Sequence, residues 1–359
     1  KDNIKQENKI FDVITIGSAT LDVLVESDSA NIVSVNSLKK KTEFMSFPYG
    51  AKVEIDGFSR NIGGGGINTA ANFANLGLKT TTVIKLGNDE IAPVIKEKMK
   101  RDGVDISNVI QSEDNLTGFS IILVSFQGDR TVLAHRGANA SISEDEIDFN
   151  VFKQAKWLYV APLAGDTNKL LDKIADFAGK NGINLAINAG STAIKKGEKY
   201  FNNILKTAKI VVMNKEEASM LTKIQVRPDT KDEKFSKKEI HPDVVTMLKK
   251  LHCREDSIAV ITDGKYGVYC YDGKNFYHAP EFAAKVVSTL GAGDAFSSTF
   301  VAAIQKIGPD VVKALAYASI NAAAVIEKFG AQEGFLTFEQ IKKRLLEHPE
   351  YEVKIVKCD

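Results

Sequence analysis

Residues 63–86 read GGGGINTAANFANLGLKTTTVIKL and place a glycine run, a helical pattern and a strand in direct succession. The glycine run is Gly63–Gly66, and the helical pattern of Ile67–Leu76 is stopped by Gly77. The segment Thr80–Leu86 is rich in β-branched residues, as buried strands are. A helix that leads into a buried strand is the repeating unit of α/β folds.

The same alternation continues on both sides of this stretch. Phe11–Ile16 has the composition of a buried strand, and Glu90–Arg101 has a helical pattern. Further short apolar strands, each next to a helical segment, are Trp157–Ala161, Asn184–Asn188, Lys209–Met213 and Ser257–Thr262. The sequence therefore predicts an α/β fold with a mostly parallel sheet that helices cover on both faces.

Two segments depart from this alternation. Residues 23–62 show short strand patterns broken by Ser, Asn, Pro and Gly, with no helical period. Phe119–Phe126 and Thr131–His135 read as a hairpin around Gln127-Gly128-Asp129. We expect these segments to form a smaller β element beside the main sheet.

The composition excludes several classes of function. The chain has 359 residues, with 47 Lys and Arg against 46 Asp and Glu, so it lacks the basic excess of a nucleic-acid-binding protein. No stretch approaches the ~20 consecutive apolar residues of a membrane-spanning helix. The three cysteines lack metal-ligand spacing and suit a reducing compartment. Because no signal peptide is recognised either, we expect a cytoplasmic protein.

Two common nucleotide-binding motifs do not occur. Gly-Lys is found at positions 179, 264 and 273 and is never followed by Ser or Thr, so there is no Walker A loop. Neither Gly63–Gly66 nor Gly291-Ala-Gly293 continues to the third glycine of the G-x-G-x-x-G dinucleotide motif. A nicotinamide-dependent enzyme is therefore disfavoured.

The loop most informative about chemistry is Ser288–Phe296, STLGAGDAF, which precedes an apolar helix. Small residues let a ligand approach the backbone, and the N–H groups at a helix start favour a phosphate there. Asp294 would repel that phosphate unless a hydroxyl lies between them. Asp294 would then take the hydroxyl proton while the amides of residues 291–294 stabilise the transferring phosphoryl group. The alternative is that Asp294 only caps the helix.

Two further residues suit a sugar-like ligand. Asn68 follows the glycine run and carries both donors and an acceptor, and Asp22 could accept hydrogen bonds from two vicinal hydroxyls. Each has a simpler alternative. A run of glycines also occurs in flexible turns that bind no ligand. An isolated aspartate in a loop, such as Asp22, is commonly a solvated surface residue.

In order along the chain, these motifs resemble those of the ribokinase-like (PfkB) family of sugar and nucleoside kinases. Gly17–Asp22 resembles its opening G-x-x-x-x-D, Gly63–Asn68 its first motif, G-G-x-G-x-N, and Gly291–Asp294 its second and most specific motif. The remaining matches are Leu86–Asp89, Gly137–Asn139, Asn214–Glu217 and Thr262–Gly267. The resemblance covers nearly the whole chain.

The resemblance implies a Rossmann-like, doubly wound core with a small β-sheet lid over the substrate. The core would comprise residues 1–22, 63–116 and 138–359, and the lid residues 23–62 and 117–137. The implied reaction is phosphorylation of a hydroxyl of a small sugar, commonly a hydroxymethyl, by ATP with Mg²⁺.

The resemblance also implies roles for individual residues. Asp294 would be the general base, and Gly291, Ala292 and Gly293 would line the anion hole. The implied substrate-binding residues are Asp22, Gly64 and Asn68. The implied nucleotide-binding residues are Asn188, Asn214, Glu217, Thr262, Gly264 and Asn321. Among these, Glu217 would hold Mg²⁺ through water, because Mg²⁺ keeps several of its waters.

The chain departs from the family pattern just before the anion hole. Ser288-Thr289-Leu290 stands where many members have Asp-Thr-Thr, so two oxygen ligands of a monovalent-cation site are missing. We expect equal rates in K⁺ and in a large organic cation. The same residues are closer to the phosphofructokinase-like branch, which makes a sugar phosphate an alternative substrate, with Arg136 the best candidate for holding its phosphate.

The sequence is also compatible with two other functions. A nucleoside (adenosine-like) kinase would stack its base on lid aromatics, for which Phe44, Phe47, Tyr49 and Phe58 are candidates. A catalytically silent sugar- or nucleotide-binding regulator would not need Asp294. In this family lid strands often pair between subunits, so an exposed lid edge would also favour a homodimer.

Overall fold

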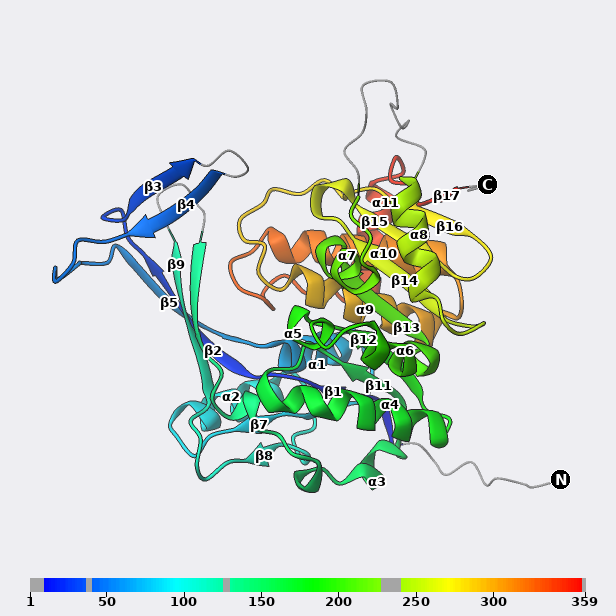
Figure 1. Cartoon of the computed structure of the whole chain (residues 1–359), viewed down its shortest axis with the longest axis horizontal. Coiled ribbons are helices and arrows are strands. Elements are labelled where there is room, and N and C mark those ends of the chain that lie inside the picture. The colour runs from blue at the N-terminus through cyan, green and yellow to red at the C-terminus, as the bar shows by residue number, and fades with distance from the viewer. Residues whose placement is uncertain (1–9, 37–40, 125–129, 227–239, 357–359) are drawn as a thin grey trace.

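A computed structural model of the chain describes residues 10–36, 41–124, 130–226 and 240–356 (Figure 1). Its largest element is a nine-stranded sheet. In spatial order the strands are β17 (Lys354–Val356), β16 (Phe276–Ala279), β15 (Val268–Tyr271), β14 (Ile258–Thr262), β13 (Ile210–Asn214), β12 (Asn184–Asn188), β11 (Ala155–Val160), β1 (Phe11–Ile16) and β6 (Thr80–Val83). The strands from β14 to β6 run parallel, whereas β15, β16 and β17 add an antiparallel edge.

Helices cover both faces of this sheet, which confirms the predicted fold class. On one face lie α3 (Phe149–Phe152), α4 (Leu170–Lys180), α5 (Ser191–Ile194), α6 (Glu198–Thr207), α7 (Lys215–Thr222) and α8 (Pro242–Leu251). On the other lie α1 (Gly65–Asn75), α9 (Ala292–Ile307), α10 (Val311–Ile326) and α11 (Phe338–Glu347). Of the remaining described helices, α2 (Ile91–Arg101) packs in a third, smaller apolar cluster.

The central strands supply both apolar layers because successive side chains of a strand point to opposite faces. In β11, Leu158 and Val160 pack in the layer under α4 and α6, whereas Trp157 and Tyr159 pack in the layer under α9 and α10. Burial on both faces explains why these segments read as continuous apolar runs.

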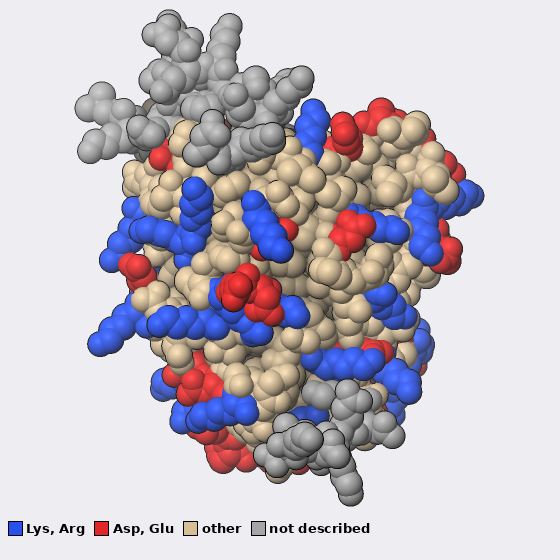
Figure 2. Space-filling view, turned by 90° about the vertical axis from the view of Figure 1, so that its right-hand side faces the viewer, with Lys and Arg blue, Asp and Glu red and all other residues tan. Residues whose placement is uncertain are grey.

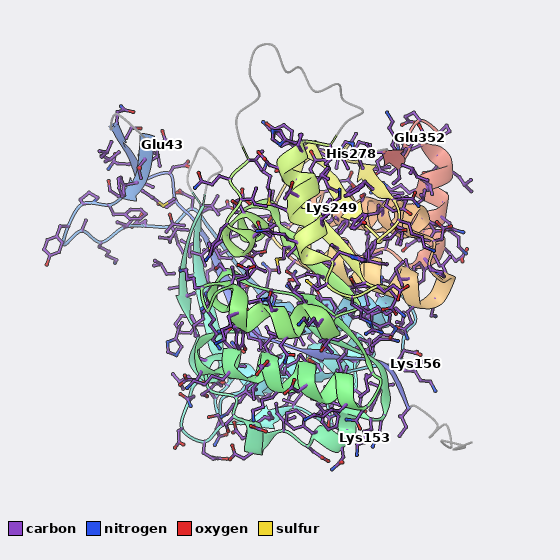
Figure 3. The ribbon with its side chains drawn as sticks, turned by 45° about the vertical axis from the view of Figure 1, so that its right-hand side comes forward. Glu43, Lys153, Lys156, Lys249, His278 and Glu352 are labelled. Carbon is purple, nitrogen blue, oxygen red and sulfur yellow. The ribbon has the colours of Figure 1, made fainter. Side chains whose placement is uncertain are left out.

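A second, four-stranded sheet stands beside the main sheet. Its order is β10 (Arg130–His135), β9 (Gly118–Val124), β2 (Thr20–Glu26) and β5 (Gly57–Gly63). β2 pairs antiparallel with β5 and parallel with β9. A hairpin of β3 (Asn31–Asn36) and β4 (Lys41–Ser46) projects from this sheet away from the helices, as Figure 1 shows and as the position of Glu43 makes clear in Figure 3.

Several local expectations differ in detail from the structure. The strand expected over 80–86 is split into β6 and β7 (Lys85–Leu86), and β7 leaves the main sheet to pair with β8 (Ile110–Gln111). The turn predicted at 127–129 lies outside the described residues. The division into core and lid segments remains a prediction, although β2, β5, β9 and β10 do form a sheet of their own.

The surface carries charges of both signs. On the face shown in Figure 2, Lys and Arg side chains lie interspersed with Asp and Glu. Lys156, which Figure 3 labels, has its Nζ 2.7 Å from Asp12 Oδ1, and this ion pair joins β11 to β1. Within the described ranges, no helix has the length and apolar character needed to cross a membrane.

Candidate active site

The N-terminus of α9 lies between two cavities at the carboxyl ends of the central strands, where α/β sheets bind ligands. Ala292 and Gly293 line the first cavity, which has a volume of about 420 Å³. Asp294, one residue further on, lines the second cavity, which has a volume of about 340 Å³. A group bound in either cavity therefore lies next to the first turn of the same helix.

Asp294 is held by a hydrogen bond from a neighbouring helix. Asn68 Nδ2, on α1, donates to Asp294 Oδ2 at 2.9 Å, and Asn68 Oδ1 accepts from Gln332 Nε2 at 2.8 Å. Burial raises the pKa of Asp294 above that of an ordinary carboxyl, and the hydrogen bond from Asn68 opposes this increase. A carboxylate with a raised pKa is a stronger proton acceptor, which suits a general base.

The pH dependence of turnover follows from this arrangement. An Asn68→Leu variant loses a donor that favours the ionised carboxylate, so the pKa of Asp294 should rise further and the acidic limb of kcat should move to higher pH. The measurement is kcat against pH at saturating substrates for the wild type and the variant. A limb that stays in place, or moves to lower pH, would contradict this assignment.

The first turn of α9 is shaped by glycine and by a buried hydroxyl pair. Gly291 is the N-cap residue with φ 79°, and a Cβ at this position would lie 2.5 Å from the Ala331 carbonyl oxygen. Ser297 Oγ donates to the Gly293 carbonyl at 2.7 Å and lies 2.7 Å from the buried Tyr159 hydroxyl. These contacts fix the start of the helix, whose first N–H groups have no partner within an α-helix and can face a phosphate.

The glycine run 63–66 is needed for a close crossing of two backbones. Gly64 has φ 102°, and a Cβ there would lie 2.6 Å from the Ser18 carbonyl oxygen. Gly66 N donates to the same oxygen at 2.9 Å. The run therefore packs tightly against the loop after β1, and the expected flexibility is not required to explain it. Gly65 also lines the cavity of Asp294.

Asp22 is buried in the second sheet and is not a solvated surface residue. Ser120 Oγ, its neighbour on β9, donates to Asp22 Oδ1 at 2.6 Å. Asp22 Oδ2 lies against Gly63, where a Cβ would collide with it. Burial raises the pKa of Asp22, and hydrogen bonds from the Ser120 and Thr20 side chains partly oppose this increase.

The cavity of Asp294 also contains Arg136 and Glu217. Glu217 and Asn214 form a capping box at the start of α7, in which Glu217 N donates to Asn214 Oδ1 at 2.8 Å and Asn214 N donates to Glu217 Oε2 at 3.1 Å. Burial raises the pKa of Glu217, and the hydrogen bond from the Asn214 backbone opposes it. Asn214 and Glu217 thus have a structural role that the sequence motif did not reveal.

The other cavity has the character of a site for a flat apolar group. Thr262 and Gly264, at the end of β14, line it beside Ala292 and Gly293. Its walls are mostly apolar and include Phe282, Val286, Phe296, Ala322, Ala323 and Ile326. A nucleotide base is the part of a triphosphate nucleotide that such walls would accommodate.

Three predicted nucleotide-binding residues, Asn188, Asn214 and Asn321, line neither cavity. Asn321 is fully buried, with Nδ2 donating to Asn72 Oδ1 at 3.0 Å and to Thr299 Oγ1 at 2.8 Å, while its Oδ1 accepts from Leu336 N at 2.8 Å. It joins α10 to α1 and α9. Asn188, at the end of β12, hydrogen-bonds to the Tyr159 side chain.

The sequence did not predict several residues that line neither cavity but hydrogen-bond to residues of the site. Gln332, Tyr159 and Ser297 belong to no motif, and their partners are distant in the chain. Asn139 was found only as part of a motif, yet its amide bonds both backbone groups of Ala19 at 2.9 and 2.8 Å. The one signal for such residues is their polarity within segments that are otherwise apolar or small.

Two cavities that meet at one helix N-terminus suit a phosphotransferase, in which a donor nucleotide and an acceptor hydroxyl approach from opposite sides. Comparison with known proteins agrees, because the model of the "pfkB family carbohydrate kinase" matches residues 29–337. The chain belongs to the pfkB family of carbohydrate kinases, and it is an ATP-dependent sugar kinase with a ribokinase-type fold.

Relatives and solved structures are similar at low identity. The 5-dehydro-2-deoxygluconokinase of Shouchella clausii is 26% identical over 355 residues, which cover 94% of this chain and 96% of that protein. A bifunctional ribokinase/ribose-5-phosphate isomerase A of Fructilactobacillus sanfranciscensis is 28% identical over 300 residues; these are 81% of this chain but 51% of that longer protein, so the chain spans about half of it. The structure of Arabidopsis thaliana ribokinase complexed with ribose and ATP aligns with a TM-score of 0.74 at 21% identity, over 93% of this chain and 98% of that chain.

Proposed function

We propose that the protein transfers the γ-phosphoryl group of ATP to a hydroxymethyl group of a small free sugar, with Asp294 as the general base. The observation that carries this proposal is that α9 begins between an apolar cavity lined by Ala292 and Gly293 and a polar cavity lined by Asp294. The nucleotide base occupies the apolar cavity, its phosphates extend across residues 291–293, and the sugar lies beside Asp294 and Asn68.

In the proposed reaction, the sugar hydroxyl gives its proton to the Asp294 carboxylate as its oxygen bonds to the γ-phosphorus. The bond between that phosphorus and the β–γ bridging oxygen breaks, and ADP leaves. The first N–H groups of α9 stabilise the charge on the transferring group. Asn68 orients the carboxylate toward the hydroxyl through its 2.9 Å hydrogen bond.

Magnesium is the metal that this reaction class requires, and the residues of the Asp294 cavity fit it. Mg²⁺ is commonly bound by one or two carboxylates together with waters and substrate phosphates. Glu217 supplies one carboxylate at the cavity wall and would hold the ion through water. When bound, the ion would neutralise phosphate charge.

The cavity next to Asp294 favours a sugar over a nucleoside. Among the described residues that line it there is no aromatic side chain on which a base could stack. Phe44 on β4 and Phe58 on β5 are exposed, as is Tyr49 in the segment between these two strands. Arg136 is a cation at this cavity, so a sugar phosphate or a sugar acid is the nearest variant of the proposed substrate.

An ADP-release screen tests the function as a whole. With Mg²⁺ and ATP, the protein should release ADP with free sugars such as ribose and with 5-dehydro-2-deoxygluconate in the same panel as sugar phosphates and nucleosides. Turnover with at least one free sugar or sugar acid is the expected result. Turnover with nucleosides alone would overturn the proposed substrate class, and no turnover with any acceptor would favour a silent binding protein.

Replacing Asp22 with Asn should weaken sugar binding without weakening the fold. A hydrogen bond from a sugar hydroxyl to a charged acceptor contributes roughly 1.5–3 kcal/mol, so KM for the sugar should rise roughly 10- to 100-fold. Because the pKa of Asp22 is raised in the folded state, the ionised carboxylate costs folding free energy at neutral pH. The melting temperature of Asp22→Asn should therefore stay level or rise.

Asp12→Asn is the matched control for this variant. Although partial burial raises it, the pKa of Asp12 is lowered overall by its contacts with Lys156 and the Lys79 backbone. Its stabilisation is present above the unfolded pKa, so Asp12→Asn should lower the melting temperature at neutral pH and leave KM unchanged. An Asp22→Asn protein with wild-type KM would refute the binding role.

Replacing Glu217 with Gln separates the proposed metal role from the capping role. Gln can keep the capping box, so the melting temperature should hold. Loss of the carboxylate that holds Mg²⁺ through water should raise the Mg²⁺ concentration for half-maximal activity roughly 10- to 100-fold. Glu216→Gln, an exposed neighbour in the same helical turn, should leave that concentration unchanged. Equal Mg²⁺ dependence in all three proteins would remove Glu217 from the metal site.

We also propose that the second sheet pairs with a second copy of the chain. Phe58, Val132 and Leu133 are exposed apolar residues on its two edge strands, β5 and β10. Exposed edges of this kind favour strand pairing. Sedimentation analysis should give a dimer that Val132→Lys disrupts; a wild-type monomer would contradict the proposal.

A further inference from the structure

Gln332 lies in the loop after α10 and contacts the proposed catalytic carboxylate only through another residue. Its Nε2 donates to Asn68 Oδ1 at 2.8 Å and, more weakly, to the Ile62 carbonyl oxygen at 3.4 Å. Its side chain is 9% exposed and is absent from the lining of both cavities. The loop that carries it also packs against the anion hole, because Ala331 lies against Gly291.

The contact with Gln332 determines which way the Asn68 amide faces. An amide has a donor end and an acceptor end, and the two can exchange by a half-turn of the side chain. The Gln332 donor occupies the acceptor end of Asn68, so the donor end points to Asp294. With the opposite orientation, Asn68 would place an oxygen against the Asp294 carboxylate and repel it.

Gln332 also carries a polar atom that the fold does not pair. Its Oε1 is buried and has no hydrogen-bond partner among the described residues. An unpaired buried acceptor costs folding free energy, and an apolar side chain of similar size would avoid that cost. The unpaired oxygen does not by itself indicate a role, and what distinguishes Gln332 is that its Nε2 donates to Asn68, the residue that holds Asp294.

We propose that Gln332 is a positioning residue for phosphoryl transfer: it fixes the orientation of the Asn68 amide and so keeps Asp294 ionised and directed at the acceptor hydroxyl. This inference rests on the proposed role of Asp294 as general base. Gln332 touches neither substrate and acts through the contact between the loop after α10 and α1.

Other charged or titratable groups face Asp294 from the elements around it. Arg136 and Glu217 line the same cavity, and the Tyr159 hydroxyl lies beneath the first turn of α9. In α1, no acidic residue lies in the first turn and no basic residue in the last. All of these groups are unchanged when Gln332 is replaced. Because Gln332→Leu adds no charge, its shift of the pH profile reports on the hydrogen bonds that link Gln332, Asn68 and Asp294, whereas the new carboxylate of Gln332→Glu also raises the pKa of Asp294 by charge repulsion.

The test uses Gln332→Glu and Gln332→Leu in the full chain, with kcat measured against pH at saturating substrates. An ionised glutamate at this position accepts hydrogen bonds only, so Asn68 should reverse its amide and turn its oxygen toward Asp294. We expect the acidic limb of kcat to move up by about one pH unit and the plateau to fall about tenfold. Gln332→Leu, which lacks the donor, should shift the limb in the same direction with a level or higher melting temperature.

Gln305 provides the matched control. It also has a buried, unpaired Oε1 and one donated hydrogen bond, from Nε2 to the Asp12 carbonyl oxygen at 3.1 Å, but it lies at the far end of α9. Gln305→Leu should leave the pH profile and the plateau unchanged. A second control is the double variant Asn68→Leu/Gln332→Leu, compared with Asn68→Leu alone. If Gln332 acts through Asn68, the added Gln332 change should not move the acidic limb of kcat any further.

A wild-type pH profile in both Gln332 variants would overturn the proposal, as would a Gln332 effect that persists in full when Asn68 is replaced by leucine. If Gln332→Glu does not fold, Gln332→Leu and the double variant still decide between these outcomes. Failure of the proposed function would look different: Asp294→Asn would then keep its turnover, whatever the Gln332 variants do.

Discussion

An Asp294→Asn variant should lose roughly 10²- to 10⁴-fold in kcat, because a positioned general base contributes about that much to a proton-transfer step. The asparagine is nearly isosteric and can still accept the hydrogen bond that Asn68 donates at 2.9 Å. The cavities and the first turn of α9 should therefore be retained. The loss should appear in kcat, with little change in the binding of either substrate.

Stability separates this outcome from misfolding. The pKa of Asp294 is raised in the folded state by burial, so its ionised form costs folding free energy above the unfolded pKa. Asp294→Asn removes that cost, and its melting temperature at neutral pH should equal or exceed that of the wild type. Turnover within a few fold of the wild type, in a folded protein, would exclude Asp294 as the base.

The second large effect is expected for Gly291→Ala. Gly291 has φ 79°, a conformation that strains alanine, and the added methyl would meet the Ala331 carbonyl oxygen at 2.5 Å. The first turn of α9 must then shift, and its N–H groups would no longer face the transferring phosphoryl group. Displacing such donors typically costs about 10²- to 10³-fold in kcat.

Gly103→Ala is the control for backbone strain alone. Gly103 has a similar φ of 76°, but no atom lies within 4 Å of its Cβ position and it is remote from both cavities. This variant should lose some stability and keep wild-type kcat at a temperature where it is folded. If Gly291→Ala also keeps wild-type kcat, the helix start does not act as an anion hole.

Much of the fold could be predicted because its causes are local. Buried parallel strands need apolar residues on both faces, and this need produced the continuous runs of Phe11–Ile16 and Trp157–Ala161 that became β1 and β11. The pairing of β2 with β9 was not predictable in this way. The two strands are distant in the chain, and their register, with Asp22 opposite Ser120, depends on the assembled sheet.

The site could be predicted only where a loop carries its own signal. The glycine loops near Gly64 and Gly291 are visible in the sequence because close backbone approach excludes other residues. Gln332 has no such signal, since its role comes from a contact with Asn68, 264 positions away. Asn321 illustrates the reverse: the family resemblance implied a nucleotide contact, whereas the structure places its amide among Asn72, Thr299 and Leu336.

The most direct measurement is a single-turnover experiment with γ-labelled ATP and an acceptor sugar found by the screen, quenched over milliseconds to minutes. Both the wild type and Asp294→Asn would be present in excess over ATP, so that binding and product release do not limit the rate. Label should move from ATP to the sugar hydroxyl in the wild type and at least roughly 100-fold more slowly in the variant, because the variant lacks the general base. Transfer of label at the same rate in both proteins would show that Asp294 is not the general base.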